Sequence, residues 1–597
     1  MRHGLVVAFL HTACCLDVWP IPRQEHASGP PLALAARFTI DYKGNSTVAT
    51  LAAARYNKLI ESHNYLQQKE ALGPTLSSLD VYVASANDTL TDWKVNESYV
   101  LAVLAGGTAT LHAPTPFGAL RGMESFYQLL EPNKAGLPHD SISIEDEPLF
   151  AHRSIMLDTG RRLFPLSFVR SVIDAMAMAK LNVLQLHLSD MGRIAWESKL
   201  FPELNVGYDT DPRYWKQDEI RELVRYGQLR GVRIVPELEM STHAKALHPL
   251  VKSQGLVFCN ESFPVMLADD PAGATAAVLR RLLAEMASLF DDAVVHVGMD
   301  EAQCHYSQQS SRDPLDVGMC GLQSPKPMCD QASVRSLQHK MLDFTAHSLS
   351  PRRVPMAWHN AYTDCGDLGG CGSSAEAPPP ATEGVPETIV QVFSSTPIGT
   401  TTLTPAQLLA NVTKAGFRAV MADASRLYLD TGSTDPVAYR RLLWDDLAAG
   451  LPEAQKPLLL GGTMPLWSDT YCSGAVECGG WAYCPGAPWP ADAPFPTGGD
   501  AESCISSLGW MQSQHEDAAF VLSAGGLLFP RANVGAGAFW NYRPELPTNG
   551  TEFLRRTSAL AASMAARGVM GICPPGCTCG FGTRCGQPIK PASEGPS

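Results

Sequence analysis

The sequence has no long hydrophobic run and no excess of basic charge. No stretch reaches about 18 uninterrupted apolar residues, the length that a membrane-spanning helix needs. The 60 acidic residues outnumber the 46 basic ones, for a formal net charge of −14. Such a surface repels nucleic acids and anionic membranes, so we expect no nucleic-acid partner and no stable membrane insertion. A neutral or cationic small substrate fits this charge better.

Two common catalytic signatures are also missing. The chain contains neither a serine nucleophile elbow nor a glycine-rich loop of the kind that cradles phosphates. Hydrophobic residues make up 45 % and charged residues 18 %, an ordinary balance for a globular protein with an ample core. At 597 residues the chain is too long for one ordinary domain, so two or three units are expected.

The N-terminus and the glycosylation motifs predict export. Arg2 and His3 precede a short apolar stretch, 4–15, that is typical of a signal peptide ending near residue 20. A buried N-terminal segment is the alternative. Six Asn-x-Ser/Thr acceptors support the secretory pathway, with the lysosome, vacuole or cell exterior as destinations. They are Asn45, Asn87, Asn96, Asn260, Asn411 and Asn549.

The cysteines are consistent with an oxidising compartment. Of the 16 cysteines, two lie in the signal-like segment, Cys14 and Cys15, and the remaining fourteen form an even set. We expect disulfides, whose pairing the sequence does not determine. The last cluster, Cys573 to Cys585, could alternatively bind zinc, but no His or Asp stands at ligand spacing there. No metal and no cofactor are therefore expected.

The chain divides into segments of different pattern. Residues 35–150 combine strand-like runs at 79–84 and 99–105 with a helical stretch at 116–130, which predicts a small α+β domain without clustered catalytic residues. Residues 151–545 alternate apolar strand-like runs with helical patterns, and residues 546–597 read as a helix and a Cys-rich tail. Strands are expected at 154–158, 183–188, 232–238, 293–297, 354–358, 389–393, 419–422 and 458–461. Helices are expected between them at 168–179, 218–230, 272–290, 333–349 and 405–415.

Eight such alternations predict a (β/α)8 TIM barrel, whose active site lies at the C-terminal ends of the strands. Carboxylates, histidines and aromatic residues gather at the predicted strand ends, and this set suits carbohydrate chemistry. They are Asp158, Arg161, His187, Asp190, Glu237, Glu239, His243, His296, Asp300, Glu301, Trp358, His359, Asn360, Tyr428, Asp430, Trp467 and Asp469.

The pair Asp300 and Glu301 matches the needs of glycoside cleavage, which uses a neutral carboxylic acid and a second group that stabilises positive charge. An ionised Asp300 would disfavour a negative charge on Glu301 and so keep Glu301 available as an acid. Trp358 and Trp467 could stack on a pyranose, and Arg161 could donate paired hydrogen bonds to sugar hydroxyls. An Asp-Glu pair is more often a solvated turn, but this one directly follows an apolar run at a barrel mouth.

Other interpretations of these residues remain open. His187 and His296 could be satisfied core histidines, and the two tryptophans could simply fill the barrel. Alternatively, Glu237, Glu239 and His243 could bind a divalent metal, although no third histidine stands close to them in the sequence.

Several ordered motifs resemble the family 20 glycoside hydrolases, the β-N-acetylhexosaminidases. The resemblance extends over about residues 35–540 and includes the stretch GALRGMESFYQLLE in the N-terminal domain. The barrel motifs are LDTGRRLFPLSFVRSVIDAMAMAKLNVLQLHLSD from Leu157, IVPELEMSTH (234–243), VHVGMDE (295–301), TIVQVF (388–393), GGTMPLW (461–467) and FPRANVGAGAFW (529–540).

The resemblance implies substrate-assisted retention, in which the substrate's 2-acetamido oxygen attacks the anomeric carbon and no enzyme nucleophile is needed. It implies that Glu301 is the acid and later the base, and that Asp300 orients the acetamide. Arg161 would hold ring hydroxyls, with Asp469 near the outer hydroxyls. The other implied site residues are Asp190, His243 and His296 as a polar shell, Trp358, Phe393 and Trp467 around the acetamido methyl, and Tyr428 on its carbonyl.

The chain departs from the family pattern at six positions, which puts substrate preference and rate in doubt. Asp469 is one methylene shorter than the usual glutamate, and Phe393 replaces a larger tryptophan wall. The other departures are Met191, Leu427, Thr463 and Gly537.

The sequence predicts an exo-acting enzyme whose substrate is an oligosaccharide or glycoconjugate with a terminal β-N-acetylhexosamine. A glycan-binding protein on an impaired barrel is the alternative, against which both acids argue. A chitin-degrading enzyme of another family, cleaving internally, is a third. The sequence does not determine whether gluco or galacto sugars are preferred or which aglycone is removed. It also leaves the oligomeric state open, with a homodimer as one option.

Overall fold

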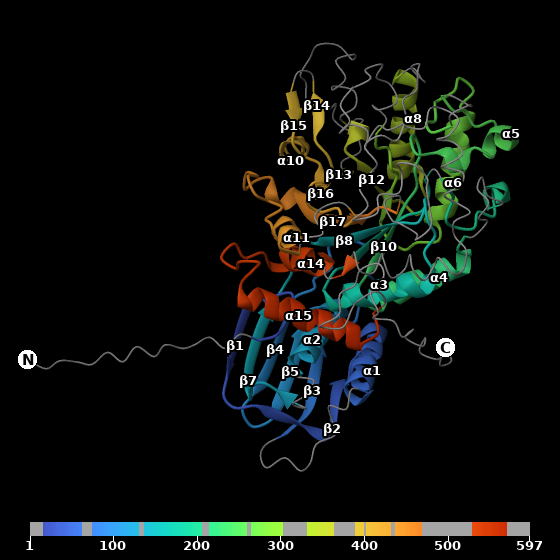
Figure 1. The fold of residues 1–597 in the computed structure, drawn as a ribbon. Helices are drawn as coiled ribbons and strands as arrows, with labels where there is room; N and C mark the ends of the chain where they lie inside the picture. The colour runs from blue at the N-terminus through green and yellow to red at the C-terminus, as the bar shows by residue number, and fades with distance from the viewer. Residues whose placement is uncertain are drawn as a thin grey trace, which may run out of the picture. The chain divides into compact units, whose positions relative to one another are not determined.

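The computed structural model describes residues 16–62, 75–130, 136–190, 192–205, 214–259, 264–301, 331–362, 388–398, 401–430, 436–468, 528–529 and 531–569. The chain divides into two compact units (Figure 1). The first unit takes residues up to 88, 95–148 and 549–563, and the second takes 89–94, 149–548 and the chain from 564. Within the described ranges, no helix is both long and apolar enough to cross a bilayer. The signal-like segment up to residue 15, Asn260, Met191, Asp469 and every cysteine from Cys304 onwards lie outside the described residues.

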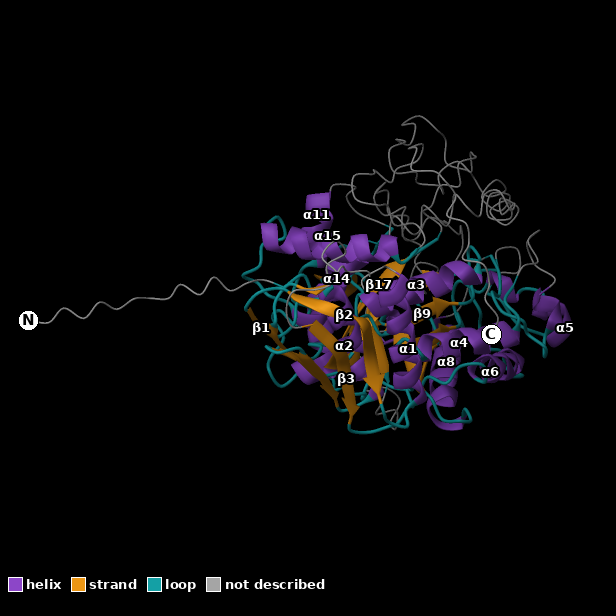
Figure 2. Ribbon diagram, turned by 90° about the horizontal axis from the view of Figure 1, so that it is seen from below, coloured by secondary structure: helices purple, strands orange, loops and turns teal. Residues whose placement is uncertain are grey.

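The first unit is built on a seven-stranded mixed sheet of order β1-β7-β4-β5-β3-β2-β6. Helix α2 lies against the three central strands and helix α1 against β2, so both cover one face of the sheet (Figure 2). The strands are β1 (Gln24–Ser28), β2 (Leu32–Tyr42), β3 (Thr75–Val83), β4 (Tyr99–Leu104), β5 (Thr108–Ala113), β6 (Gly136–Leu137) and β7 (Ser141–Asp146), and the helices are α1 (Thr47–Ser62) and α2 (Pro116–Leu129). The expected α+β domain is confirmed.

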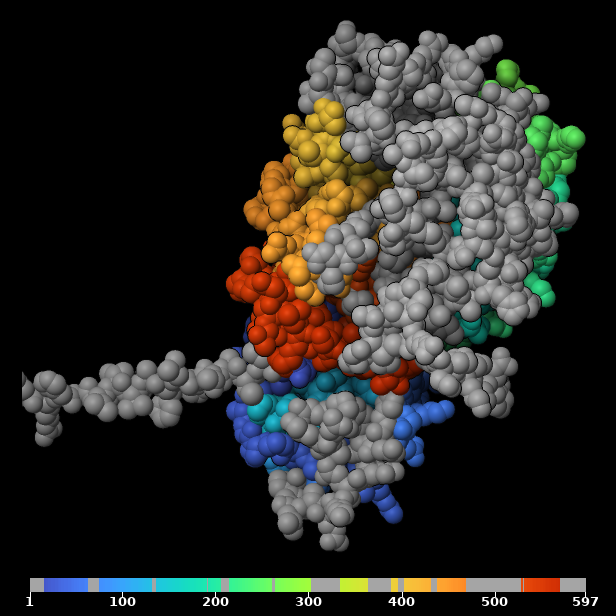
Figure 3. Space-filling view, viewed as in Figure 1, coloured from blue at the N-terminus to red at the C-terminus, as the bar shows by residue number. Residues whose placement is uncertain are grey.

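Residue alternation explains which face of this sheet is covered. In β4, Leu101 and Val103 are buried while Val100 and Leu104 are exposed, as expected for a strand with one face packed and one face open. Helix α15 (Thr551–Ala566) begins in this unit, where Arg556 binds the backbone oxygen of Val18 and the carboxylate of Glu25. Helix α15 (red) reaches the molecular surface in the space-filling view (Figure 3).

The second unit is a closed barrel of eight parallel strands, which confirms the predicted fold. Each strand except β17 lies within about two residues of its expected position. The strands are β8 (His152–Asp158), β9 (Val183–His187), β10 (Arg233–Glu237), β11 (Val294–His296), β12 (Val354–Trp358), β13 (Ile389–Val392), β16 (Arg418–Met421) and β17 (Leu459–Leu466). The strands are buried on both faces, which is why they read as nearly continuous apolar runs.

Helices alternate with these strands, as expected. Helix α10 shows why one begins where it does: Thr404 Oγ1 accepts from the N–H of Gln407, Gln407 Oε1 accepts from the N–H of Thr404, and Pro405 occupies the first position. The helices are α3 (Leu166–Met178), α4 (Gln217–Gln228), α5 (Leu250–Gln254), α6 (Ala274–Ala287), α8 (Gln331–Asp343), α10 (Pro405–Lys414), α11 (Pro436–Leu443) and α14 (Arg531–Asn541). A short hairpin of β14 (Thr396–Ile398) and β15 (Thr401–Leu403) precedes α10.

Candidate active site

Four neighbouring strands end in a paired row of acids and histidines. Asp158 of β8 pairs in register with His187 of β9, His187 with Glu237 of β10, and Glu237 with His296 of β11. All four side chains are buried. Because these positions are the C-terminal ends of parallel strands, the row lies directly beneath the barrel mouth, where the sequence predicted the site.

Glu237 is the centre of this row. Its carboxylate accepts hydrogen bonds from Gln185 Nε2 and Trp358 Nε1, both at 2.8 Å, and lies 3.1 Å from His187 Nδ1. Burial opposes its charge, but the neighbouring His296 and His187 and the hydrogen bond from Gln185 lower the pKa of Glu237 to about 2. Glu237 therefore stays ionised and fixes the ring of Trp358 by a charge-assisted bond.

Arg161 links the loops after the first two barrel strands. Its guanidinium contacts Asp158 Oδ2 at 2.9 Å and Asp190 Oδ2 at 3.0 Å, and it lies 5.1 Å from the centre of the Trp467 ring. Asp190 also faces His187 Nε2 at 2.8 Å. Despite burial, Arg161, His243 and His187 hold the pKa of Asp190 well below its usual range. The guanidinium is thus held in one orientation at the edge of the site.

The chain turns sharply after β11 to present the two adjacent acids. Gly298, Met299 and Glu301 have left-handed φ angles of 65°, 78° and 54°. At Gly298 a Cβ would lie 2.0 Å from a carboxylate oxygen of Glu239, so a larger residue would have to displace that carboxylate and also adopt a strained backbone angle. The same carboxylate of Glu239 accepts a hydrogen bond of 3.0 Å from the N–H of Met299. Non-glycine residues adopt such angles only when their surroundings impose them.

This turn places both acids beside His243. His243 Nε2 lies 3.2 Å from Glu301 Oε2 and 3.8 Å from Asp300 Oδ2, and its Nδ1 lies 3.6 Å from Asp190 Oδ1. Although burial opposes its charge, Asp190, Asp300 and Glu301 raise the pKa of His243 well above its ordinary value. His243 is therefore a cation between three carboxylates.

Asp300 is the more buried of the two acids. Its side chain is 9 % exposed, against 21 % for Glu301. Burial and the nearby carboxylates of Glu301 and Glu237 raise the pKa of Asp300 to about 6, although His243 opposes the shift. One of its oxygens, Oδ1, has no hydrogen-bond partner among the described residues. A buried carboxylate oxygen in that condition is available to a donor on a ligand.

Aromatic side chains from the opposite strands form the other half of the site. Trp358, at the end of β12, contacts Phe393 with ring centres 5.2 Å apart at 74° and Trp467 at 6.0 Å. Tyr428 follows at 6.2 Å from Trp467. Burial, together with Asp430, Asp300 and Glu301, raises the pKa of Tyr428 well above its ordinary value, so its hydroxyl stays protonated. Acids thus come from β8 to β11 and aromatic rings from the barrel strands that follow.

Comparisons with known proteins show the family of the chain. The model of "Glycosyl hydrolase family 20, catalytic domain" matches residues 150–473, more than half of the chain. The chain belongs to glycosyl hydrolase family 20. A second model, described as "beta-acetyl hexosaminidase like", matches residues 18–129 of the first unit.

Relatives within family 20 are similar over most of their length. The β-hexosaminidase subunits beta of Mus musculus and Homo sapiens are each 26 % identical to this chain. Each match covers 76 % of this chain, together with 81 % of the mouse protein and 78 % of the human protein. A chitobiase from Flavobacterium johnsoniae has the same fold, with a TM-score of 0.66 at 20 % identity over 93 % of this chain and 74 % of its own. A β-hexosaminidase from Streptomyces plicatus, solved in complex with the product GlcNAc, gives a TM-score of 0.62 at 19 % identity. The match covers 94 % of this chain and 97 % of the Streptomyces chain.

The structure brings most of the predicted site residues of this family 20 hydrolase together. Arg161, Asp190, His243, Asp300 and Glu301 are linked by the ion pairs given above, and Trp358, Phe393, Tyr428 and Trp467 form one aromatic cluster. His296 is fully buried, 5.3 Å from Trp358 and 3.2 Å from Glu237, so it supports the site from below. Asp469 lies outside the described residues.

Sequence reasoning undervalued several supporting residues. The sequence offered Glu237 as a metal ligand and His187 as a core histidine, but in the structure they connect the acid half of the site to Trp358. Ser468 was missed; its N–H and hydroxyl donate to Asp158 at 3.1 Å each. Its position directly after Trp467, at a barrel strand end, was the available signal. Of the family departures, Thr463 and Leu427 are buried, and Gly537 lies inside α14.

The suggested metal triad of Glu237, Glu239 and His243 is not one cluster. Among the described residues, Glu237 and Glu239 gather around His187, whereas His243 gathers with Asp300 and Glu301. The three residues therefore do not form one candidate metal site.

Proposed function

We propose that this family 20 hydrolase is an exo-acting, retaining β-N-acetylhexosaminidase. It would remove terminal β-linked N-acetylglucosamine or N-acetylgalactosamine from oligosaccharides or glycoconjugates by substrate-assisted catalysis. The relatives named as β-hexosaminidases and the structure holding GlcNAc support this choice of sugar. The observation that carries the mechanism is Asp300 Oδ1, a buried carboxylate oxygen without a hydrogen-bond partner among the described residues.

Asp300 would act on the substrate's acetamide. Its Oδ1 accepts the N–H, which turns the acetamide oxygen toward the anomeric carbon. As that oxygen bonds to the carbon, positive charge spreads over the forming oxazolinium ring. Burial makes a bare negative charge on Asp300 costly, so a cation formed next to it is stabilised more strongly than in water.

Glu301 would transfer the proton. It gives its proton to the glycosidic oxygen while the bond from that oxygen to the anomeric carbon breaks and the aglycone leaves as an alcohol. The resulting carboxylate then takes a proton from a water molecule whose oxygen attacks the anomeric carbon and opens the oxazolinium ring. His243, 3.2 Å away and cationic, stabilises the carboxylate form of Glu301 between the two steps.

The aromatic half of the site would hold the acetamide. Trp358, Phe393 and Trp467 offer an apolar enclosure for its methyl group, and the protonated Tyr428 hydroxyl can donate to its oxygen. Arg161 reaches the ring hydroxyls from a position fixed by Asp158 and Asp190.

We also propose that the protein functions in the secretory pathway, in a lysosome or vacuole or outside the cell. Cys259 is disulfide-bonded, which suits an oxidising compartment. Five predicted glycosylation sites are exposed, as acceptors of N-glycans must be. These are Asn45, Asn87, Asn96, Asn411 and Asn549.

The test is release of p-nitrophenol from its β-N-acetylglucosaminide and β-N-acetylgalactosaminide between pH 4 and 8. We expect turnover with at least one substrate, and kcat/KM should fall as the pH drops below about 6, where Asp300 takes up a proton. Folded protein that binds these sugars without turnover would be a glycan-binding protein and would refute the enzymatic proposal.

A further inference from the structure

The open face of the sheet in the first unit carries a row of exposed side chains across five neighbouring strands. Register pairs join them in the order Gln24 of β1, Glu145 of β7, Val100 of β4, His112 of β5 and Tyr82 of β3. All five are exposed. Four steps between strands make the row about 19 Å long.

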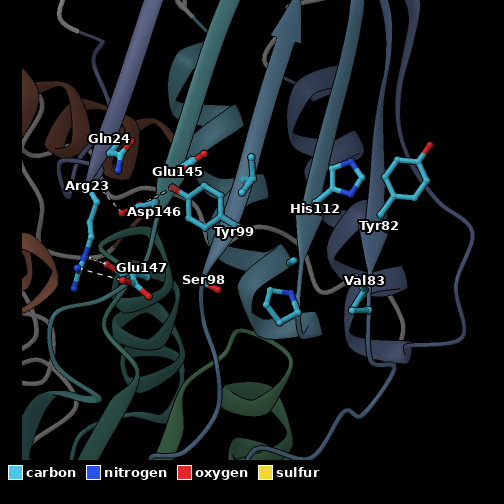
Figure 4. Close-up of a pocket in the computed structure, with 14 residues that line it drawn as sticks. Arg23, Gln24, Tyr82, Val83, Ser98, Tyr99, His112, Glu145, Asp146 and Glu147 are labelled. Atoms are coloured by element: carbon cyan, nitrogen blue, oxygen red, sulfur yellow. Dashed lines mark hydrogen bonds and ion pairs between the residues drawn. The ribbon is translucent and has the colours of Figure 1, made fainter. Parts of the chain in front are cut away.

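The two ends of the row differ in chemistry. At one end the rings of Tyr82 and His112 stack 4.7 Å apart at 14°, and the tyrosine is 52 % exposed (Figure 4). At the other end Gln24 and Glu145 present an amide and a carboxylate. The row therefore combines a flat aromatic surface with hydrogen-bonding groups.

A cavity of about 640 Å³ lies along this row, within the size range of small-ligand sites. Its floor is stiff: the buried Tyr99 hydroxyl donates to Asp146 at 2.7 Å, and Asp146 accepts from the Arg23 N–H at 3.1 Å. Arg23 also pairs with Glu147 at 3.2 Å at the polar end (Figure 4). A preformed floor reduces the ordering cost of binding.

We propose that this row is an accessory binding site for a neutral oligosaccharide chain, separate from the catalytic residues. Sugar rings have an apolar C–H face that stacks on aromatic rings and hydroxyls at the rim that bond to amides and carboxylates. The acidic residues Glu145, Asp146 and Glu147 outnumber Arg23 among the charged residues of the lining, which disfavours anionic glycans and nucleic acids. This accessory site rests on the proposed function only for the kind of sugar that it would bind.

A protein partner fits this face less well. Its large exposed apolar side chains are Tyr82, Val100 and Leu104, and polar residues such as Thr108 and Glu145 stand among them. Stable protein interfaces need a continuous, well-packed area of roughly 800 Å² per partner. A linear ligand that lies across the strands requires far less.

The test is calorimetric titration of the full chain with tetra-N-acetylchitotetraose, in a Glu301→Gln background to prevent cleavage. We expect two binding sites per chain. Adding Tyr82→Ala and His112→Ala should weaken the second site about ten-fold or abolish it. Tyr82→Phe, which keeps the ring, and Leu104→Ala, which removes an exposed apolar side chain outside the cavity lining, should both retain the second site.

Each alternative outcome is informative. Equal binding by the double alanine variant, or a single site in the parent that the double substitution leaves intact, would overturn the accessory site. A dimer in sedimentation that Tyr82→Glu dissociates, with glycan binding unchanged, would identify the face as a protein interface instead. The catalytic proposal is judged separately, because p-nitrophenol release by the Tyr82 and His112 variants should equal that of the wild type. If the wild type showed no turnover, the catalytic proposal would fail and the accessory site would still stand.

Discussion

Replacing Asp300 with asparagine should make the protein more stable at alkaline pH and far less active. Burial raises the pKa of Asp300 to about 6 from an ordinary value of 3.8, so the folded protein holds this proton more tightly than the unfolded chain. This preference contributes stability that is fully present below about pH 4 and is lost as the pH rises through 6. Asparagine has the same shape and no charge, so it removes that loss.

The size of the effect follows from the shift. About two pKa units correspond to ~3 kcal/mol. The stability difference between Asp300→Asn and the wild type should therefore increase by up to ~3 kcal/mol between pH 4 and pH 8. For a unit of several hundred residues, this is on the order of 3 °C in Tm. Activity on acetamido substrates should fall at the same time, because asparagine cannot offset the oxazolinium charge.

The assay is thermal unfolding followed by near-ultraviolet circular dichroism in steps from pH 4.5 to 8. A suitable control is Asp218→Asn, because that carboxylate is 87 % exposed and its ion pair with Arg221 lies on the surface. At pH 8 the control should change Tm by less than Asp300→Asn does. If Asp300→Asn gave the same Tm difference at pH 4.5 and pH 8, burial would not penalise the charge and the reasoning would fail. Unchanged rates would remove substrate assistance.

Three further predictions concern the same site. Glu301→Gln should lower kcat by about 10²–10⁴-fold with little change in binding, because the proton donor is lost; near-normal kcat in steady-state assays would exclude Glu301 as the acid. Arg161→Lys should raise KM about ten-fold, since an ammonium cannot bridge Asp158 and Asp190 while facing a sugar; an unchanged KM would remove Arg161 from substrate binding. Glu237→Ala should lower the free energy of unfolding by ~3–5 kcal/mol, because it leaves the buried donors of Gln185 and Trp358 unpaired. Denaturant titration measures this, and an unchanged free energy of unfolding would contradict the central position of Glu237.

The barrel was predictable because its strands are buried on both faces. Runs such as 183–188 and 354–358 are mostly apolar, and the polar residues near their ends, His187 and His359, mark the mouth. Helix α1 was not predicted, although its buried positions follow a helical spacing, because its run of small alanines gives a weak apolar signal. Helix α14 was not predicted either, since Gly535 and Gly537 are poor helix formers and only packing in the barrel unit explains it.

The electrostatics of the site could not be predicted from sequence. Adjacent acids suggested that Asp300 carries the charge and Glu301 the proton. Relative burial decides that balance, and burial depends on residues far away in the chain. His243 and Glu239 lie about 60 positions before the acids, yet they set the surroundings of Asp300. Such contacts arise from the closure of the barrel.

The left-handed turn at 298–301 has a consequence for protein engineering. Neighbouring side chains on an extended strand point in opposite directions. Here both carboxylates lie near one histidine only because the backbone coils the unusual way around Gly298 and Met299. Transplanting the dipeptide Asp-Glu onto another barrel would therefore separate the two groups. A designer would have to copy the four-residue loop together with the carboxylate of Glu239 that holds its amide.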